Sequence, residues 1–384
     1  MKIAFITPNI YSTGGRERVL ANWANYFSEC LNYKVSIITP FRRNERPFFP
    51  FNTNIEIVNI SSKKKGNSII PSIFHFYERF KYRKILNKEL TTILGHNNYD
   101  IVISLWWGED YKVLYKIKDK SKKILTYHLT NSAIKQSIYN ESNIIRKIKK
   151  IYNYHRDLHI AAKYDAFIVL TKTDMNDWLN DYKFTNIDYI PNALELSTDK
   201  CSTLKEKVIL CLGRLSYEKG VDRIINVWQH IHYLYPDWVL RIVGSGSEEK
   251  KLKQLARDYN ILNIEFQPFT DNVIQQFCES SIFVLGSRYE GFGMVLIEAQ
   301  NFGLPVVAYD IKCGPADIII DGESGFLIPD NSEILFAKKI SELIENETLR
   351  KRMGEAAKII SQTKFSKSII YDKWNDLFNR LLKS

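Results

Sequence analysis

Two glutamates, Glu290 and Glu298, stand eight positions apart in the segment EGFGMVLIE. The apolar run 282–285 before this segment predicts a buried strand, and the residues from Met294 onward predict a helix. Backbone N–H groups at a helix start bind anions, and glycines such as Gly293 let a ligand approach the main chain closely. One glutamate before the helix and one within it are therefore placed to bind hydroxyl groups on either side of a diphosphate. The alternative interpretation is that both are ordinary solvated side chains.

A second segment, GRLSYEKG, runs from Gly213 to Gly220 directly after the predicted strand 207–211. Arg214 and Lys219 leave the end of that strand together, so both side chains can reach one diphosphate. Arginine offers a rigid fork of donors and lysine a point charge. Cations in loops are commonly just exposed, but the place of this segment ahead of the glutamate pair favours anion binding.

The N-terminal half offers two more candidates. Gly14 and Gly15 follow the apolar run 2–6 and open a predicted helix. They lack the lysine of a P-loop and the full dinucleotide fingerprint, so on their own they indicate a tight turn. His128 follows the predicted strand 123–127, and active-site groups of α/β sheets gather at the carboxyl ends of strands. A histidine there also serves as a structural hydrogen-bonding group, and both interpretations stay open.

Two further loop residues are candidates for contacts with a nucleobase or a phosphate. Gly244 directly follows the predicted strand 238–243, and Phe269 comes later in the chain. A place in an ordinary loop is an equally good interpretation of each residue. The chain has no Asp-x-Asp pair, which argues against enzymes that bind a diphosphate through a divalent cation, and no His/Cys cluster that suggests zinc. We expect no metal and no cofactor, with Arg214, Lys219 and helix N-termini stabilising negative charge.

Short apolar runs alternate with helical segments along the chain, which predicts an α/β architecture of two doubly wound, Rossmann-like domains. Predicted strands cover 2–6, 34–39, 101–105, 123–127 and 166–170, and then 207–211, 238–243, 281–285 and 305–309. We predict one domain at 1–195, a second, ligand-binding domain at 196–365, and a C-terminal helix at 366–384 that packs back on the first. A ligand cleft between the two domains is the expectation.

With these segments in this order, the chain resembles the retaining glycosyltransferases of family 4 (glycosyl transferases group 1), which have the GT-B fold. The resemblance covers almost the whole chain and is clearest between residues 207 and 330. It implies an acceptor-side first domain and a nucleotide-sugar-binding second domain. The catalytic residues that it implies are Glu290 on the donor sugar, Arg214 and Lys219 on the leaving diphosphate, and His128 near the transferred sugar. Its implied donor-binding residues also include Glu298 on the ribose, and Gly14, Gly15, Gly244, Phe269, Gly291, Phe292, Gly293, Met294 and Val295.

The resemblance leads to one hypothesis for the activity. The protein would move a hexose or N-acetylhexosamine, with retention, from a nucleotide-sugar, expected to be a UDP-sugar. The acceptor would be a polyprenyl-diphosphate-linked saccharide in the synthesis of a surface polysaccharide such as O-antigen or capsule. Two alternatives are a sugar-nucleotide epimerase, which would need no acceptor, and a non-catalytic module that senses nucleotide-sugars at a membrane surface.

The charge distribution suggests a further partner. The net charge is +11, and residues 1–195 hold 30 lysines and arginines against 18 aspartates and glutamates. Two segments there, 73–88 and 142–154, mix basic residues with aromatic residues or isoleucines. They suit interfacial helices on an anionic membrane, and a solvated basic face is the alternative. No nucleic-acid recognition motif appears, so we expect no nucleic-acid partner.

The expected location follows from what the chain lacks. Its start does not have the pattern of a signal peptide, and no window holds the ~18 apolar residues of a membrane span. The five scattered cysteines indicate reduced thiols. We therefore expect a cytoplasmic protein, peripheral to the inner face of the cell membrane.

Overall fold

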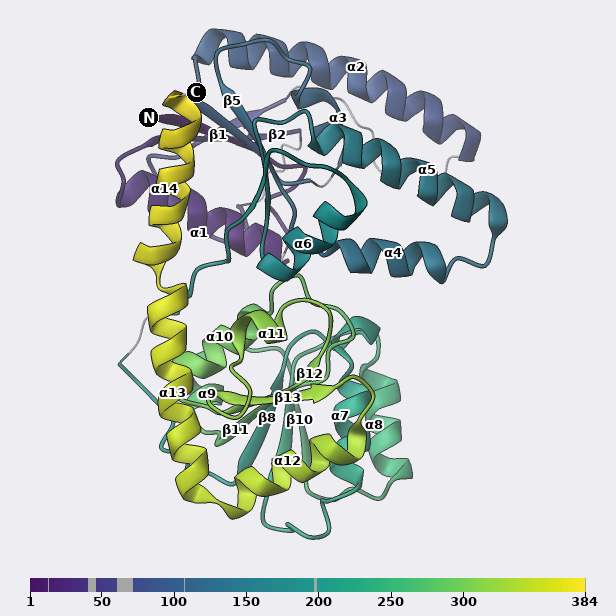
Figure 1. The fold of residues 1–384 in the computed structure, drawn as a ribbon, viewed down its shortest axis with the longest axis vertical. Coiled ribbons are helices and arrows are strands. Elements are labelled where there is room, and N and C mark those ends of the chain that lie inside the picture. The colour runs from purple at the N-terminus through teal and green to yellow at the C-terminus, as the bar shows by residue number, and fades with distance from the viewer. Residues whose placement is uncertain (13, 41–45, 61–71, 107, 197–198, 384) are drawn as a thin grey trace. The chain divides into compact units, whose positions relative to one another are not determined.

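The structure is a computed structural model of residues 1–384, of which it describes all but 13, 41–45, 61–71, 107, 197–198 and 384. The side chains of 72–77 also lie outside the description. The chain divides into two compact units (Figure 1). The first unit holds 1–170, 175–190 and 373–384, and the second holds 171–174 and 191–372.

A parallel sheet forms the centre of the first unit, in the order β3-β2-β1-β4-β5-β6-β7. Its strands are β1 (Lys2–Ile6), β2 (Lys34–Thr39), β3 (Glu56–Asn59), β4 (Ile101–Ser104), β5 (Lys122–Thr126), β6 (Ala166–Val169) and β7 (Ile187–Tyr189). The strand order reverses between β1 and β4. The loops that follow those two strands leave in opposite directions, and this is where open α/β sheets bind ligands.

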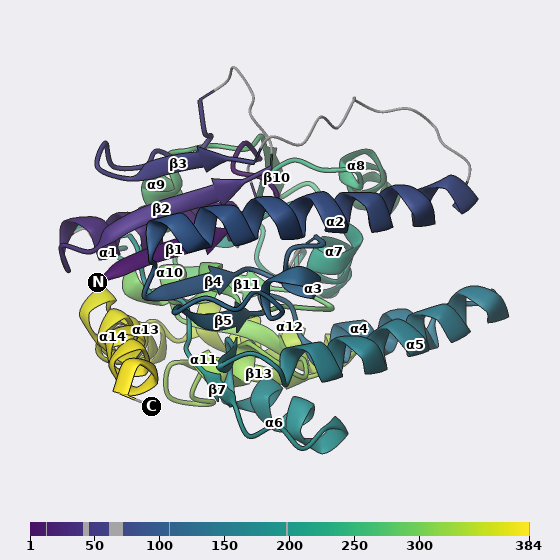
Figure 2. The ribbon, with the colours of Figure 1, turned by 90° about the horizontal axis from the view of Figure 1, so that it is seen from above.

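Helices cover the first sheet on both faces (Figures 1 and 2). They are α1 (Gly15–Glu29), α2 (Ser72–Asn97), α3 (Tyr111–Leu114), α4 (Asn131–Tyr139), α5 (Ile144–Ala161), most of α6 (Lys172–Asp181) and the end of α14 (Lys367–Lys383). The end of α14 is held by aromatic packing, because the Trp374 and Trp23 ring centroids lie 4.8 Å apart and Phe378 meets Phe27 edge-on at 5.4 Å. Tyr33 Oη donates to Asn375 at 2.6 Å. The last residues of the chain therefore complete the core of the first unit.

The second unit repeats the design with the strand order β10-β9-β8-β11-β12-β13, again parallel. Its strands are β8 (Val208–Leu212), β9 (Val239–Val243), β10 (Ile264–Gln267), β11 (Ile282–Leu285), β12 (Val306–Asp310) and β13 (Gly325–Pro329). Its helices are the 3-10 turn η1 (Tyr217–Lys219), α7 (Val221–Gln229), α8 (Glu249–Asp258), α9 (Val273–Cys278), α10 (Met294–Asn301), α11 (Pro315–Ile318), α12 (Glu333–Glu345), α13 (Glu347–Phe365) and the start of α14. The order reverses between β8 and β11, as it does between β1 and β4 in the first unit.

The fold prediction of two doubly wound α/β domains is confirmed. Helix α7 begins at Val221, directly after the 3-10 turn, because Gly220 is left-handed with φ +57° and separates the two elements. In the part of the chain that the structure describes, no helix is long and apolar enough to span a bilayer.

Candidate functional site

The second unit joins two of the predicted site residues directly. Lys219 Nζ donates to Glu290 Oε1 at 2.6 Å, and Ser287 Oγ donates to the same oxygen at 2.7 Å. Glu290 is buried, whereas one third of the Lys219 side chain stays exposed. Before a ligand binds, the buried carboxylate neutralises the charge of the lysine. Because the lysine also reaches solvent, its ammonium group can then bind an incoming anion.

Two glycines bring these loops together. Gly220 follows Lys219 and Gly286 ends β11. A Cβ added to Gly220 would lie 2.1 Å from the Gly286 carbonyl oxygen, and one added to Gly286 would lie 2.3 Å from that of Gly220. Real Cβ atoms do not come this close, so only glycine fits at both positions. This backbone contact sets the distance between Lys219 and Glu290.

Arg288 fastens the same contact from outside and was not predicted from the sequence. It donates two hydrogen bonds to the carboxylate of Asp222, at 2.8 and 2.6 Å, and one to the Tyr217 carbonyl at 2.9 Å. Its guanidinium also lies over the Tyr217 ring, 4.2 Å from the centroid. Burial raises the pKa of Asp222, but the hydrogen bond and charge of Arg288 outweigh it and hold that pKa below its usual value. Arg288 therefore joins the start of α7 to the loop that carries Glu290.

Arg223 supports that loop from beneath and was also not predicted. Its side chain is buried and donates to the carbonyls of Gly286 and Ser287, at 3.2 and 3.4 Å. The guanidinium stacks on Tyr309 at 3.6 Å and pairs with Asp330. The one signal in the sequence is an arginine among the apolar residues of 221–228, which also hold Asp222 and Asn226. This signal does not identify the groups that Arg223 contacts.

The glycine segment 291–293 leads into α10 as predicted. Gly293 is the N-cap with φ +96°, and the helix begins at Met294. Glu298 lies in the second turn and is buried, which is not the solvated position of the alternative interpretation. Phe292 and Gly293 are also buried, whereas Met294 and Val295 are partly exposed at the helix start.

The remaining predicted donor residues lie on neighbouring loops. Gly244 touches the loop after β8, since a Cβ there would lie 1.9 Å from the Gly213 carbonyl oxygen. Arg214 is exposed. The pKa of Glu218 is lowered first by hydrogen bonds with the Ser216 side chain and the Glu218 backbone, and the charge of Arg214 lowers it further. Phe269 is exposed after β10. The structure thus joins Lys219 to Glu290 directly, and it leaves Arg214 and Phe269 on the surface.

In the first unit, Gly14 is the N-cap of α1 and Gly15 its first residue. The carboxylate of Glu17 folds back over this helix start, because a Cβ on Gly14 would lie 2.2 Å from Glu17 Oε2. Gly15 has no neighbouring atom within 4 Å of an added Cβ. A carboxylate of the protein itself therefore lies at the helix start whose glycines the resemblance implies for donor binding.

His128 lies at the carboxyl end of β5 as predicted, with its ring 5.3 Å from that of Trp23 and Nε2 3.2 Å from Thr126 Oγ1. Burial, and then the charge of Arg16, lower its pKa to about 3. The ring is therefore neutral at physiological pH and can exchange hydrogen bonds but carries no charge.

A buried carboxyl that the sequence did not single out lies in the same unit. Asp110 accepts a hydrogen bond from Ser104 Oγ at 2.6 Å, and burial raises its pKa to about 6. The charge of Asp110 also raises the pKa of Arg16, which burial lowers overall. Asp110 therefore interacts electrostatically with a group at the carboxyl edge of the first sheet. Among the described residues, no cluster of His, Cys, Asp and Glu side chains is arranged to hold a metal ion.

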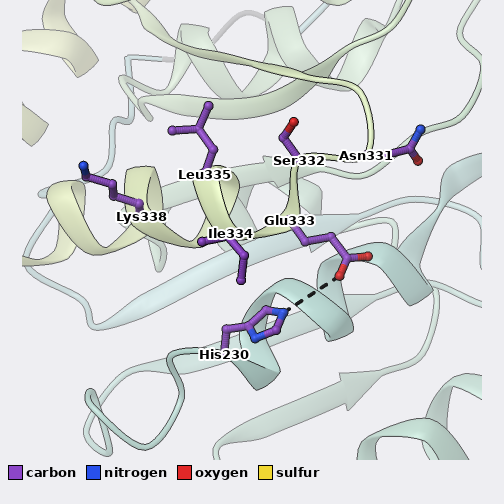
Figure 3. Close-up of a pocket in the computed structure, with 7 residues that line it drawn as sticks. All are labelled: His230, Asn331, Ser332, Glu333, Ile334, Leu335 and Lys338. Atoms are coloured by element: carbon purple, nitrogen blue, oxygen red, sulfur yellow. Dashed lines mark ion pairs between the residues drawn. The ribbon is translucent and has the colours of Figure 1, made fainter.

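A hollow of about 690 Å³ also lies in the second unit (Figure 3). Its lining comes from the end of α7 and the start of α12: His230, Asn331, Ser332, Glu333, Ile334, Leu335 and Lys338. His230 Nε2 lies 3.9 Å from Glu333 Oε2. None of the predicted site residues lines it.

Two family models match the chain. Residues 13–198 match the model of Glycosyltransferase Family 4, and residues 197–359 match that of glycosyl transferases group 1. An uncharacterized glycosyltransferase of Haemophilus influenzae is 31% identical over 98% of this chain and 99% of its own. The amylovoran biosynthesis glycosyltransferase AmsD of Erwinia amylovora is 27% identical over 98% of this chain and 99% of its own.

The fold also matches solved structures. A crystal structure of a Staphylococcus aureus TarM mutant, in complex with fondaparinux, α-GlcNAc-glycerol and UDP, superposes with a TM-score of 0.77 at 18% identity. It covers 98% of this chain and 99% of that one. These matches favour a transferase over the epimerase and the sensing module. The chain belongs to glycosyltransferase family 4 and is a glycosyltransferase with the GT-B fold.

Proposed function

We propose that this glycosyltransferase moves a hexose or N-acetylhexosamine, with retention, from a UDP-sugar to a lipid-linked saccharide. The contact between Lys219 and Glu290 is the observation that carries the proposal. It places a partly exposed cation and a buried carboxylate at the reversal of the second sheet, where the loops after β8 and β11 meet. The cation can bind a diphosphate, and the carboxylate can accept a hydrogen bond from a sugar hydroxyl.

Each group then has a task in the transfer. The bond between the sugar C1 and the diphosphate oxygen breaks, and the acceptor oxygen forms its bond to C1 while its proton passes to an oxygen of the departing diphosphate. Lys219, exposed Arg214 and the backbone N–H groups at the start of α10 stabilise the charge that grows on the departing diphosphate. Glu290 accepts a hydrogen bond from the sugar, and buried Glu298 binds the ribose. Neutral His128 exchanges a hydrogen bond with the sugar. No metal or other cofactor takes part.

The names of relatives support the donor and the pathway class. TarM was crystallised with UDP. AmsD is named for amylovoran biosynthesis, and CapM of Staphylococcus aureus, 29% identical over 46% of this chain, for capsular polysaccharide biosynthesis. We therefore propose a role in polysaccharide synthesis, with a polyprenyl-diphosphate-linked saccharide as acceptor. Such an acceptor lies in a membrane, so the enzyme would work in the cytoplasm at the inner membrane face.

The test is release of nucleoside diphosphate from a panel of UDP- and GDP-sugars, with and without an extract of lipid-linked acceptors. We expect release from one UDP-sugar that depends on the acceptor, and a loss of about 100-fold or more in kcat for Lys219→Ala and for Glu290→Gln. Lys339→Ala is the matched control, because Lys339 has similar exposure and pairs with Glu342 at 2.8 Å on α12. Release from no donor, or full activity of both site variants, would refute the proposal. The anomeric configuration of the product tests retention.

A further inference from the structure

The first turns of α5 expose an unusual number of large apolar side chains. Ile144, Ile145, Ile148, Ile151 and Tyr152, here called the isoleucine face, have exposed fractions between 40% and 75%. The other end of the same helix is buried through Leu158 and Ile160. The helix is therefore anchored in the first unit at one end and presents its apolar residues to solvent at the other.

The isoleucine face is continuous and bordered by lysines. At 100° per residue, positions 144, 145, 148, 151 and 152 fall on one side of the helix. Lys147 and Lys149 border that side on its two flanks. Among the described residues no ion pair involves Lys149, and Lys147 lies over the ring of Tyr139, 5.6 Å from its centroid. Tyr139, at the end of α4, is 79% exposed. Figures 1 and 2 show α4 and α5 as a hairpin whose tip extends beyond the sheet.

We infer that the tip of the α4–α5 hairpin, residues 139–152, docks on a membrane of anionic lipids. The isoleucine face and Tyr139 would enter the boundary between headgroups and acyl chains, while Lys147 and Lys149 extend to lipid phosphates. Such a membrane has an apolar interior beneath a negatively charged surface. Isoleucines can be buried in that interior while the lysines beside them contact the surface charge. The inference deepens the proposed function, on which it rests for the lipid-linked acceptor.

A second copy of the chain suits this surface less well. A two-fold contact through the isoleucine face would bring Lys147 and Lys149 of one copy against the same residues of the other. The segment 139–152 holds four basic residues and one acidic residue, so this contact would be repulsive. That acidic residue, Glu141, is already paired with Lys150 at 3.0 Å.

The other basic segment, 73–88, contributes less to this surface. The side chains of Phe74, Phe76 and Tyr77 lie outside the described residues. Arg83 pairs with Glu109, and burial raises the pKa of Tyr82 to about 12. Both side chains face the body of the first unit. Phe80 is exposed beneath Lys84, and among the described side chains of α2 Ile85 is the one other exposed large apolar residue.

The test measures sedimentation of the full chain with phosphatidylcholine vesicles, with and without phosphatidylglycerol, at low ionic strength. We expect binding only with phosphatidylglycerol. Lys147→Gln with Lys149→Gln should weaken the partition coefficient roughly 25-fold, fivefold for each charge. Ile145→Asp with Ile148→Asp should abolish binding. The matched controls are Ile334→Asp with Ile359→Asp, which are equally exposed on the second unit, and Lys250→Gln with Lys364→Gln. Both should bind like the unchanged chain.

Three outcomes would overturn the inference: no binding to phosphatidylglycerol vesicles, equal binding to vesicles without it, or unchanged binding of the α5 variants. A dimer in sedimentation equilibrium that Ile145→Asp with Ile148→Asp dissolves would identify a second copy as the occupant instead. Vesicle binding needs no donor and no turnover, so it can succeed or fail separately from the transferase assay. All substituted residues are exposed or partly exposed, and circular dichroism checks that the variants are folded.

Discussion

Arg288 and Asp222 form a two-pronged ion pair that connects the two loops of the candidate site. Asp222 is the second residue of α7, three residues after Lys219, and Arg288 lies two residues before Glu290. Together with the Gly220–Gly286 backbone contact, the pair therefore fixes the separation of Lys219 and Glu290, although neither member needs to touch a substrate. A bidentate arginine–carboxylate contact constrains both distance and angle, which a lysine in its place would not do.

Replacing Arg288 tests this positioning role. We expect Arg288→Ala to lower kcat by about 10- to 100-fold, because a small displacement of catalytic groups has effects of that size. Arg288→Lys should recover only part of the loss, since it restores charge without the fork. KM for the donor should change much less than kcat.

Arg241→Ala is the control for Arg288. Arg241 is also largely buried and contacts two acids, Glu265 and Glu279, at 3.1 and 3.3 Å, but it lies on β9. It should reduce thermal stability with little effect on kcat. Equal kcat losses in the two variants would assign Arg288 a purely structural role.

The contact between Gly220 and Gly286 predicts a large stability effect. Gly220→Ala places a Cβ 2.1 Å from a backbone oxygen and demands φ +57°, so we expect the free energy of unfolding to fall by about 3 kcal/mol or more. Gly322→Ala isolates the dihedral strain, because Gly322 has φ +75° and an added Cβ would have no neighbouring atom within 4 Å. It should cost about 1 kcal/mol. Urea unfolding measures both, and similar losses would show that the backbone contact is unimportant.

Asp110 predicts a specific pH dependence of stability. Its pKa is raised from 3.8 to about 6 in the folded chain, so the folded state binds the proton more tightly than the unfolded state. The stability that it contributes is present below pH 3.8 and is lost as the pH rises through 6. Asp110→Asn removes this loss. Relative to the unchanged chain, the variant should therefore gain about 3 kcal/mol across that interval.

Thermal unfolding between pH 4 and 8 measures the gain for Asp110→Asn. Asp376→Asn is the control, because Asp376 is exposed in the same unit. A constant difference between Asp110→Asn and the unchanged chain would mean that Asp110 does not titrate in this range. The sign is the informative result, since substitution of a paired, low-pKa aspartate gives the opposite slope.

The sequence alone identified the nine interior strands and missed the four strands at the sheet edges, β3, β7, β10 and β13. Interior strands of a parallel sheet are covered on both faces and read as continuous apolar runs. The edge strands are three to five residues long and most are only partly buried, as in Glu56–Asn59 and Ile187–Tyr189, so their sequences resemble loops.

Lys219 and Glu290 were also identified from the sequence. The glycines and charges that mark their segments, and the order of those segments, can be read directly from the chain. The sequence did not identify Arg223, Arg288 or Asp110. Arg288 meets Asp222 across 66 positions and Arg223 meets Asp330 across 107, and nothing in either segment names the other. Only the strand order, with β8 beside β11, brings those segments together. The raised pKa of Asp110 likewise arises from burial, which exists only once the sheet and its helices have packed.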